Sequence, residues 1–282
     1  MRVLVDGDAS FVLDIVVVFS KLMDFEVLVF SNVEATTRHI DYGFRLCELG
    51  PDSADNEIVA EVVLSDLVIT DDNLLALRCL KRGAKVLSNS GHLYSEADFY
   101  EDKMGWKMRG KAKSRKDIIS KYQDFIAAFF ALTGHAAKKE GPGTIHIFRL
   151  GFNQDQRISR KRAIAIAAYY GYRFHLYTRK ESLAQNNPQY ATYLPTSESR
   201  RLDLIEGFKA GDIVVTSENY FASQVLRTGA KAINHEGYIF KKQDFYKNKG
   251  KEKAPVKTLN RQVLHEGKFF EALMKLAADP KR

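Results

Sequence analysis

The chain has 282 residues, the 45% hydrophobic fraction of an ordinary globular protein, and a length that suits two domains of about 140 residues each. It contains no run of roughly 20 apolar residues and no apolar leader after Met1, and its two cysteines are too few for a disulfide framework. We therefore expect a cytoplasmic protein with reduced thiols and no membrane span.

The net charge of +8 is divided unequally along the chain. Residues 1–137 carry 16 basic and 21 acidic side chains, net −5, which leaves 27 and 14, net +13, for residues 138–282. The first half therefore suits bound cations, and the second half suits a polyanion.

In chain order, short apolar runs predict five strands in the first half, at residues 2–5, 26–30, 44–49, 67–69 and 86–87. Helical periodicity between them predicts helices from Phe11 to Val18, from Ser53, and from Leu74 to Leu80. Asp8 or Ser10 is the expected N-cap of the first helix. Helices that alternate with strands predict right-handed crossovers and a doubly wound, mostly parallel α/β sheet.

The segment 65–100 is repeated at 211–246. Aligned without a gap at an offset of 146, the two copies share Asp66/Asp212, Val68/Val214, Thr70/Thr216, Asn73/Asn219, Ala76/Ala222, Leu80/Leu226, Gly-Ala-Lys at 83–85 and 229–231, Gly91/Gly237 and a closing Asp-Phe-Tyr. A repeat of this length predicts a duplicated domain. We expect domains at residues 1–137 and 144–282, joined by a linker at residues 138–143.

Carboxylates follow the predicted strands of the first copy. Asp6 and Asp8 come after the first strand, Asp72 follows the fourth, and Asp55 lies in the first turn of a helix. Neighbouring parallel strands end about 4.8 Å apart, so these groups can converge, and a hard cation such as Mg²⁺ or Mn²⁺ would relieve their repulsion. The alternative for each acid taken singly is a helix cap, and we expect Asp71 only to face solvent.

Three stretches resemble the YaiI/YqxD family of small bacterial proteins with a PIN-like fold, over roughly residues 1–132: Val5-Asp6-Gly7-Asp8-Ala9, Ser53-Ala54-Asp55 with Ile58-Val59, and Asp66-Leu67-Val68-Ile69-Thr70 running to Asp72. The resemblance implies two tandem PIN-like domains, each a Rossmann-like three-layer α/β/α sandwich. By analogy with PIN nucleases it implies a phosphodiesterase in which Asp6, Asp8, Asp55 and Asp72 hold Mg²⁺ or Mn²⁺ and are the catalytic residues. Ser10-Phe11 stands where the family has Cys-Pro, and Asn89-Ser90-Gly91 replaces an Asn-Pro-Arg-Gly-like turn, which bears on substrate contacts more than on metal binding.

The Asp-x-Asp pattern also resembles the haloacid-dehalogenase phosphatases, in which Asp6 would be the nucleophile and Asp8 the general acid. Those enzymes need a lysine ahead of the second acidic motif, and this chain has none between Lys21 and Lys81. They also favour Thr or Val where this chain has Ala9. Phosphatase activity is therefore the minority hypothesis.

Basic residues crowd the segment 103–116, which also holds Trp106, the only tryptophan. Such a segment could follow a nucleic-acid backbone and stack one base, and the alternative is a solvated arm. The acids of the first copy are mostly replaced in the second, where Arg201 and Glu218 align with Asp55 and Asp72. Residues Arg149 to Asn153 are expected at the place of Asp6 and Asp8.

Arginines near the start of the second copy's first helix suit a phosphate. We therefore expect a second copy that has lost the metal and holds a polyanion, and the alternative is a scaffold that only packs against its twin. Substrate contacts are expected from polar and basic residues at strand ends, helix starts and loops: Ser10, Asn32, Asn73, Lys111, Lys113, Arg115, Arg157, Arg160, Lys161, Arg162 and Arg179.

The sequence thus predicts a metal-dependent nuclease acting on RNA in preference to DNA, with a second domain that aids substrate binding. The rival hypothesis is a nucleic-acid-binding or regulatory protein without turnover. Pairing of the two domains within the chain is expected, and a homo-oligomer stays open. No Gly-x-Gly-x-x-Gly or Walker lysine loop occurs, so no nucleotide cofactor is expected.

Overall fold

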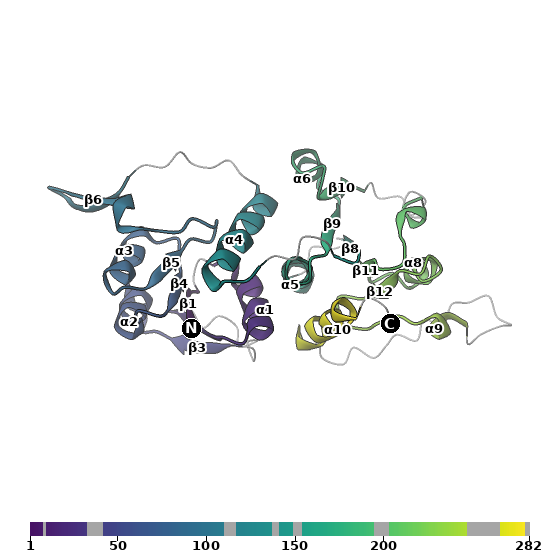
Figure 1. Ribbon diagram of the computed structural model, residues 1–282, viewed down its shortest axis with the longest axis horizontal. Helices are drawn as coiled ribbons and strands as arrows, with labels where there is room; N and C mark the ends of the chain where they lie inside the picture. The colour runs from purple at the N-terminus through teal and green to yellow at the C-terminus, as the bar shows by residue number, and fades with distance from the viewer. Residues whose placement is uncertain are drawn as a thin grey trace. The chain divides into compact units, whose positions relative to one another are not determined.

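The computed structural model describes residues 1–7, 10–32, 42–109, 117–136, 141–148, 154–194, 203–246 and 266–279, without the side chains of residues 154–158, 246, 266 and 267. The chain divides into two compact units, residues 1–136 and 137–282 (Figure 1). Among the described helices, none has both the length and the apolar character needed to cross a membrane.

The first unit is built on a five-stranded parallel sheet. Its strands are β1 (Arg2–Asp6), β2 (Glu26–Ser31), β3 (Gly43–Leu46), β4 (Leu67–Ile69) and β5 (Lys85–Leu87), in the order β3-β2-β1-β4-β5. Helices α2 (Ser53–Glu61) and α3 (Asn73–Lys81) cover one face, and α1 (Leu13–Met23) and α4 (Ile118–Thr133) cover the other (Figure 1). The predicted doubly wound α/β sandwich is confirmed.

The strand order makes one edge of this sheet special. The chain passes from β1 to β2 on one side, whereas β4 pairs with β1 on the other side, so the strand order reverses at β1. The carboxyl ends of β1 and β4 form the topological switch point, which is where open α/β sheets bind ligands. Leu4 belongs to the core beneath α2 and α3, and because side chains alternate along a strand, Asp6 points to the same face.

The start of α1 differs from the prediction. The helix begins at Leu13, with Val12 at the cap position and no side-chain cap. Ser10 instead donates its hydroxyl to Asn89 Oδ1, at 2.9 Å, and Asp8 lies outside the described residues. The N-cap is thus Val12 and not Ser10 as predicted, because the first helical hydrogen bonds run to the Val12 carbonyl, two residues further along the chain.

An antiparallel hairpin follows β5 where the sequence predicts only a basic loop. It consists of β6 (Phe99–Asp102) and β7 (Gly105–Met108), preceded by the 3₁₀ turn η1 (Glu96–Asp98). Its strands, Phe-Tyr-Glu-Asp and Gly-Trp-Lys-Met, mix aromatic and charged residues, so they lack the continuous apolar run that marks the buried strands of the sheet.

The second unit repeats the architecture of the first. Its strands are β8 (Thr144–Phe148), β9 (Arg173–Thr178), β10 (Ala191–Tyr193), β11 (Ile213–Val215) and β12 (Lys231–Ile233), all parallel, in the order β10-β9-β8-β11-β12. Its described helices are α5 (Gln154–Tyr170), α6 (Glu181–Asn186), η2 (Ile205–Gly207), α8 (Asn219–Val225), α9 (Lys242–Tyr246) and α10 (Glu266–Ala278). The matching order confirms two tandem Rossmann-like folds.

Glycines shared by the two copies hold corresponding packing contacts. Gly91 has φ +83°, and a Cβ there would overlap the backbone of Asp124 in α4. Gly237 has φ +87°, and a Cβ there would overlap the backbone of Lys268 in α10. In each unit, therefore, the last described helix (α4 or α10, the closing helix) packs directly on the turn that follows the last strand of the parallel sheet (β5 or β12).

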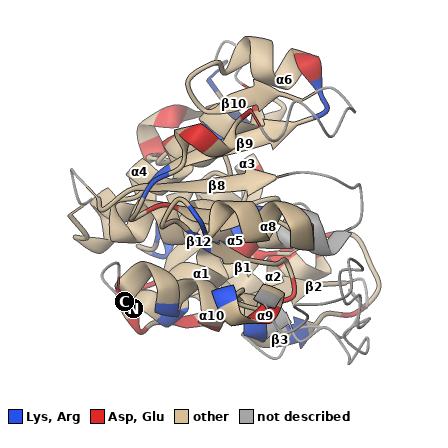
Figure 2. Cartoon of the chain, turned by 90° about the vertical axis from the view of Figure 1, so that its right-hand side faces the viewer, with Lys and Arg blue, Asp and Glu red and all other residues tan. Residues whose placement is uncertain are grey.

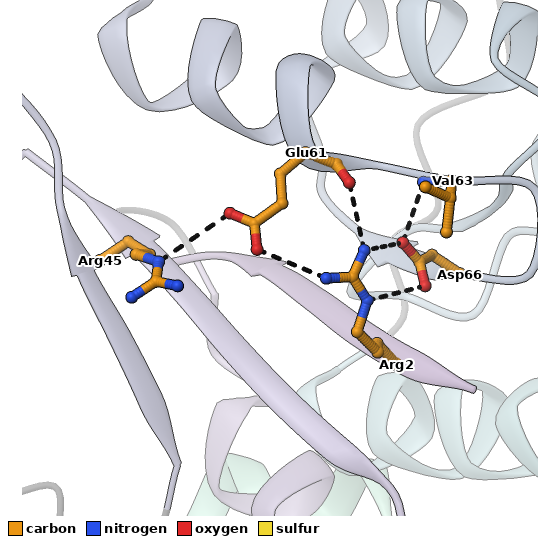
Figure 3. A network of polar contacts seen from close by, with 5 residues as sticks. All are labelled: Arg2, Arg45, Glu61, Val63 and Asp66. Carbon is orange, nitrogen blue, oxygen red and sulfur yellow. Dashed lines mark hydrogen bonds and ion pairs between the residues drawn. The ribbon is translucent and has the colours of Figure 1, made fainter.

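The shared aspartates, by contrast, lie at the amino ends of the strands. Asp66 accepts from Arg2 Nη2 at 2.7 Å and from the Val63 amide at 2.9 Å, while Glu61 links Arg2 to Arg45 (Figure 3). In the second unit, Asp212 accepts from the amides of Thr144, at 2.8 Å, and Lys209, at 3.0 Å. This repeated aspartate is structural, on the edge opposite the switch point.

Candidate functional site

Three predicted acids come to the switch point of the first unit from three separate segments. Asp6 ends β1, Asp72 lies between β4 and α3, and Asp55 lies in the first turn of α2. Thr70, which is 1% exposed, donates to Asp6 Oδ2 at 2.8 Å and accepts from the Asp72 amide at 2.9 Å. Its hydroxyl therefore ties the end of β1 to the start of α3.

The carboxyl of Asp55 responds to its neighbours. Burial, and after it the negative charges of Asp72, Asp6 and Asp52, together raise its pKa from 3.8 to about 6, against the opposing effect of Arg78. The carboxylates of Asp6 and Asp72 therefore repel the charged form of Asp55, and a bound cation would reduce this repulsion.

Carboxylates can influence one another's charge without lying close enough to bind the same metal ion. Within the described part of the chain, no three Asp, Glu, His or Cys side chains lie close enough to hold a metal ion, and Asp8 lies outside it. Because Mg²⁺ usually keeps several water ligands and binds through one or two carboxylates, this donor set fits a hydrated hard cation better than a closed protein cage.

Asp72 also caps α3. Its Oδ1 accepts from the amides of Leu74, at 2.7 Å, and Leu75, at 2.9 Å, while no hydrogen bond to its Oδ2 occurs among the described residues. The capping role and a ligand role therefore use different oxygens of one carboxylate.

A polar chain joins the ends of three strands beside these acids. Ser10 donates to Asn89 Oδ1, and the Asn89 amide donates to Asp71 Oδ1, each at 2.9 Å. Asp71 is thus exposed but holds the turn after β5, so the expectation that it only faces solvent is wrong. Asn89 is 1% exposed, and its Nδ2 has no hydrogen-bond partner among the residues that the structure describes.

A buried donor without an acceptor costs about 1–3 kcal/mol, so Asn89 Nδ2 suits an oxygen from a ligand or an ordered water. Sequence reasoning noted residues 89–91 only as a departure from the family turn. In the sequence, Thr70 belongs to the repeat and to one stretch that resembles the family, and neither assigns it a role in the site. The fact that the repeat preserves the hydroxyl at Thr70/Thr216 was the one signal that could have found it.

The other predicted contacts of the first unit are placed in part. Asn32 follows β2 and is half-buried, and Asn73, the first residue of α3, accepts from the Tyr94 hydroxyl at 3.3 Å. Burial raises the pKa of Tyr94 to about 12, so this phenol stays a donor at neutral pH. Lys111, Lys113 and Arg115 lie outside the described residues.

Aromatic rings take the place of the acids in the second unit. In the first unit Leu4 pairs with Val68, and in the second unit His146 pairs with Val214, the counterpart of Val68. His146 therefore corresponds to Leu4, and Phe148, two residues further on, corresponds to Asp6. Phe148 is buried and stacks on Tyr177, with ring centroids 4.2 Å apart, and its ring also meets those of Phe208 and Phe221. The counterpart of Asp6 therefore lies just before the expected segment, Arg149 to Asn153.

The predicted cations of the second unit differ in exposure. Arg162 is only 4% exposed, Arg160 and Lys161 are half-buried on α5, and the side chain of Arg157 is not described. Arg179 follows the carboxyl end of β9 and is exposed, next to Lys180 and ahead of α6, whose first turn holds Glu181. Figure 2 shows basic and acidic segments next to each other beside α6. Of the predicted cations whose side chains are described, Arg179 is thus the most open to a polyanion.

Comparison with known proteins gives the same family twice along the chain. A family model described as "Uncharacterized BCR, YaiI/YqxD family" matches residues 4–125 and again residues 161–263. A UPF0178 protein of Ruminiclostridium cellulolyticum is 31% identical over 128 residues, which cover 43% of this chain and 81% of the relative. A UPF0178 protein of Sulfurimonas denitrificans is 38% identical over 100 residues, which cover 34% of this chain and 65% of the relative, just under two thirds.

Among solved structures, the GsuK RCK domain matches with 13% identity and a TM-score of 0.21, over 83% of this chain and 73% of that chain. A score this low does not establish a shared fold.

Proposed function

The chain belongs to the YaiI/YqxD family, and from that premise we propose that it is a metal-dependent nuclease whose site lies at the carboxyl ends of β1 and β4. The observation that carries the proposal is the meeting of Asp6, Asp55 and Asp72 at the switch point, with Thr70 bonded to two of the three. Helix capping accounts for only one oxygen of Asp72.

Asp6, Asp55 and Asp72, together with Asp8, would hold Mg²⁺ or Mn²⁺, which prefer oxygen ligands. When bound, such an ion activates water and stabilises negative charge on a phosphate. Thr70 orients Asp6 by donating to Oδ2. Asn89 offers its buried Nδ2 to an oxygen at the same edge.

The substrate we propose is RNA, ahead of DNA. Residues 138–282 carry a net charge of +13, and Arg179 is exposed at the carboxyl edge of the second sheet, where it would attract the phosphate backbone. In this proposal the second unit aids binding and leaves the chemistry to the first.

A second candidate function is nucleic-acid binding or regulation without turnover. It is favoured by one finding: within the described ranges, no three potential metal-ligating side chains lie close enough to enclose an ion.

The test is cleavage of labelled single-stranded RNA and DNA with Mg²⁺ or Mn²⁺, with binding recorded in the same samples. Asp55→Asn and Asp72→Asn remove a charge, and asparagine also caps helices, so α3 keeps its N-cap in the second variant. We expect cleavage to fall by about 10²–10³-fold in both, with binding retained. Glu57→Gln, on the same helix as Asp55, is the control and should cleave like the native chain.

Binding by the native chain without any metal-dependent cleavage would contradict the nuclease and favour the second candidate. Equal cleavage by Glu57→Gln and Asp55→Asn would remove Asp55 from the site.

A further inference from the structure

The β6–β7 hairpin presents aromatic rings on both of its faces. Tyr100 is 39% exposed and Trp106 is 38% exposed. The register pairs Tyr100 with Lys107 and Trp106 with Glu101, and because paired residues share a face and successive residues alternate, the two rings lie on opposite faces. Phe99 is buried on the Trp106 face, so that face is turned toward the unit and the Tyr100 face toward solvent.

Each of these rings is accompanied by a cation. Lys81 Nζ, from α3, lies 4.2 Å from the centroid of Trp106, and Arg109 Cζ lies 6.0 Å from the centroid of Tyr100. The acids of the hairpin are Glu101 and Asp102, and Asp102 is paired with Lys107. Ring and cation together match a nucleotide, whose base stacks while its phosphate pairs with the charge.

The charge of this segment is complementary to a polyanion. Residues 103–116 contain seven Lys and Arg residues and no acid. Lys103, at the turn of the hairpin, is exposed. Phosphates of a bound strand would therefore meet positive charge along the hairpin.

The hairpin is also joined to the candidate site. Tyr94 donates to Asn73, which follows Asp72, and the ring of Tyr94 stacks on Phe99, the first residue of β6, with centroids 6.1 Å apart. Two successive contacts, through Tyr94, therefore join the start of α3 to the start of the hairpin.

We propose that the β6–β7 hairpin is a stacking surface for the unpaired bases of single-stranded nucleic acid, with Tyr100 on its solvent-facing side as the stacking ring, Lys103 and Arg109 as the phosphate contacts, and Trp106 on the opposite side as the spectroscopic reporter. The proposal rests on the proposed nuclease only for the identity of the bound strand as substrate. Stacking tolerates any base, so the hairpin contributes affinity and not sequence specificity.

Because Trp106 is the only tryptophan, its fluorescence reports on this hairpin alone. The experiment titrates the full-length chain in EDTA with oligo(U), oligo(dT) or duplex RNA of about 12 nucleotides per strand, within the usual site size for single strands. Emission is recorded beside the anisotropy of a labelled oligonucleotide. We expect saturable quenching by oligo(U) and oligo(dT), weakened by salt, and the ratio of their affinities separates RNA from DNA.

Three variants make the assignment specific. Tyr100→Ala should weaken binding about 5- to 100-fold, the range of a lost base stack. Trp106→Phe keeps a ring, so it should retain binding by anisotropy within about threefold while the signal disappears. Met104→Ala is the control, because Met104 is 86% exposed on the same hairpin and has no ring. Its binding should match that of the native chain, and circular dichroism confirms folding of each variant.

The proposal is overturned if anisotropy shows binding without a change in emission, or if Tyr100→Ala binds like the native chain. Equal quenching by duplex RNA or by polyglutamate would also overturn it, because neither offers unpaired bases. These binding measurements need no metal, so the stacking proposal can be supported even if the chain has no nuclease activity. Conversely, metal-dependent cleavage by Tyr100→Ala with an unchanged KM would support the nuclease proposal and contradict the role of the hairpin in binding.

Discussion

Asp55 lies where its ionisation opposes folding. Its pKa is raised from 3.8 to about 6 by burial and by the charges of Asp72 and Asp6, so the folded chain holds this proton more tightly than the unfolded chain. The stability that this group contributes is complete below about pH 3.8 and is lost as the pH rises through about 6.

Asp55→Asn carries no charge at any pH. We therefore expect it to melt about 2–5 °C above the native chain at pH 8, with the difference disappearing near pH 4. Thermal melts at pH 4, 6 and 8 check this, and Mg²⁺ at pH 8 should raise the melting temperature of the native chain more than that of the variant. A difference that is the same at all three pH values would contradict it.

For individual residues, the sequence predicts where the site acids lie but not which residues form hydrogen bonds with them. The strand ends of Asp6 and Asp72 follow from apolar runs that can be counted in the chain. The bond from Thr70 to Asp6 spans 64 residues, and that from Ser10 to Asn89 spans 79, so neither follows from local spacing. Such partners become visible only once β1, β4 and β5 are laid side by side.

The elements depend on close packing between each closing helix and the turn beneath it. Gly91 combines a positive φ with direct contact to the backbone of α4, whereas Gly105 has φ +109° and open space around it. We expect Gly91→Ala to cost about 3 kcal/mol or more and Gly105→Ala about 1–2 kcal/mol, because only the first adds a steric overlap to the backbone strain.

Urea unfolding of the two variants gives these values directly. Gly237→Ala should resemble Gly91→Ala, since the same overlap occurs with Lys268 of α10. If Gly91→Ala were no more costly than Gly105→Ala, the close packing of α4 on the turn would not matter for stability.

Elements with a buried apolar run are predictable, and those without one are not. Strands β1, β2 and β4 follow from Val, Leu and Ile runs. The hairpin is missed because its strands, Phe-Tyr-Glu-Asp and Gly-Trp-Lys-Met, mix aromatic and charged residues, a composition that a loop can also show. Helix α4 begins at Ile118 because Asp117 accepts from the amides of Ile119 and Ser120 and so caps it.

For the whole molecule, the unequal charge of the two halves predicts a measurable salt dependence. Arg179→Ser removes an exposed charge at the carboxyl edge of the second sheet, and Lys209→Ser removes one at its amino edge. We expect Arg179→Ser to make the slope of log K for single-stranded RNA against log salt shallower by about 0.7, the share of one phosphate contact. Lys209→Ser should leave the slope unchanged.

Anisotropy titrations between low and physiological salt measure both slopes, and equal slopes for the two variants would argue against binding at the carboxyl edge.

The duplication itself could be predicted from residues 65–100 and 211–246, because their apolar pattern and glycines are kept in both copies. The identity of the residue that replaced Asp6 could not, because it depends on the register of β8 against β11.

That replacement bears on the evolutionary history of the duplicated copy. Phe148 lies among the rings of Tyr177, Phe208 and Phe221, so a single reversion to aspartate would bury a charge among aromatic rings. Each intermediate on the way back to an acidic copy would be less stable than its parent. Once the aromatic cluster had formed, the divergence of the two copies was therefore difficult to reverse.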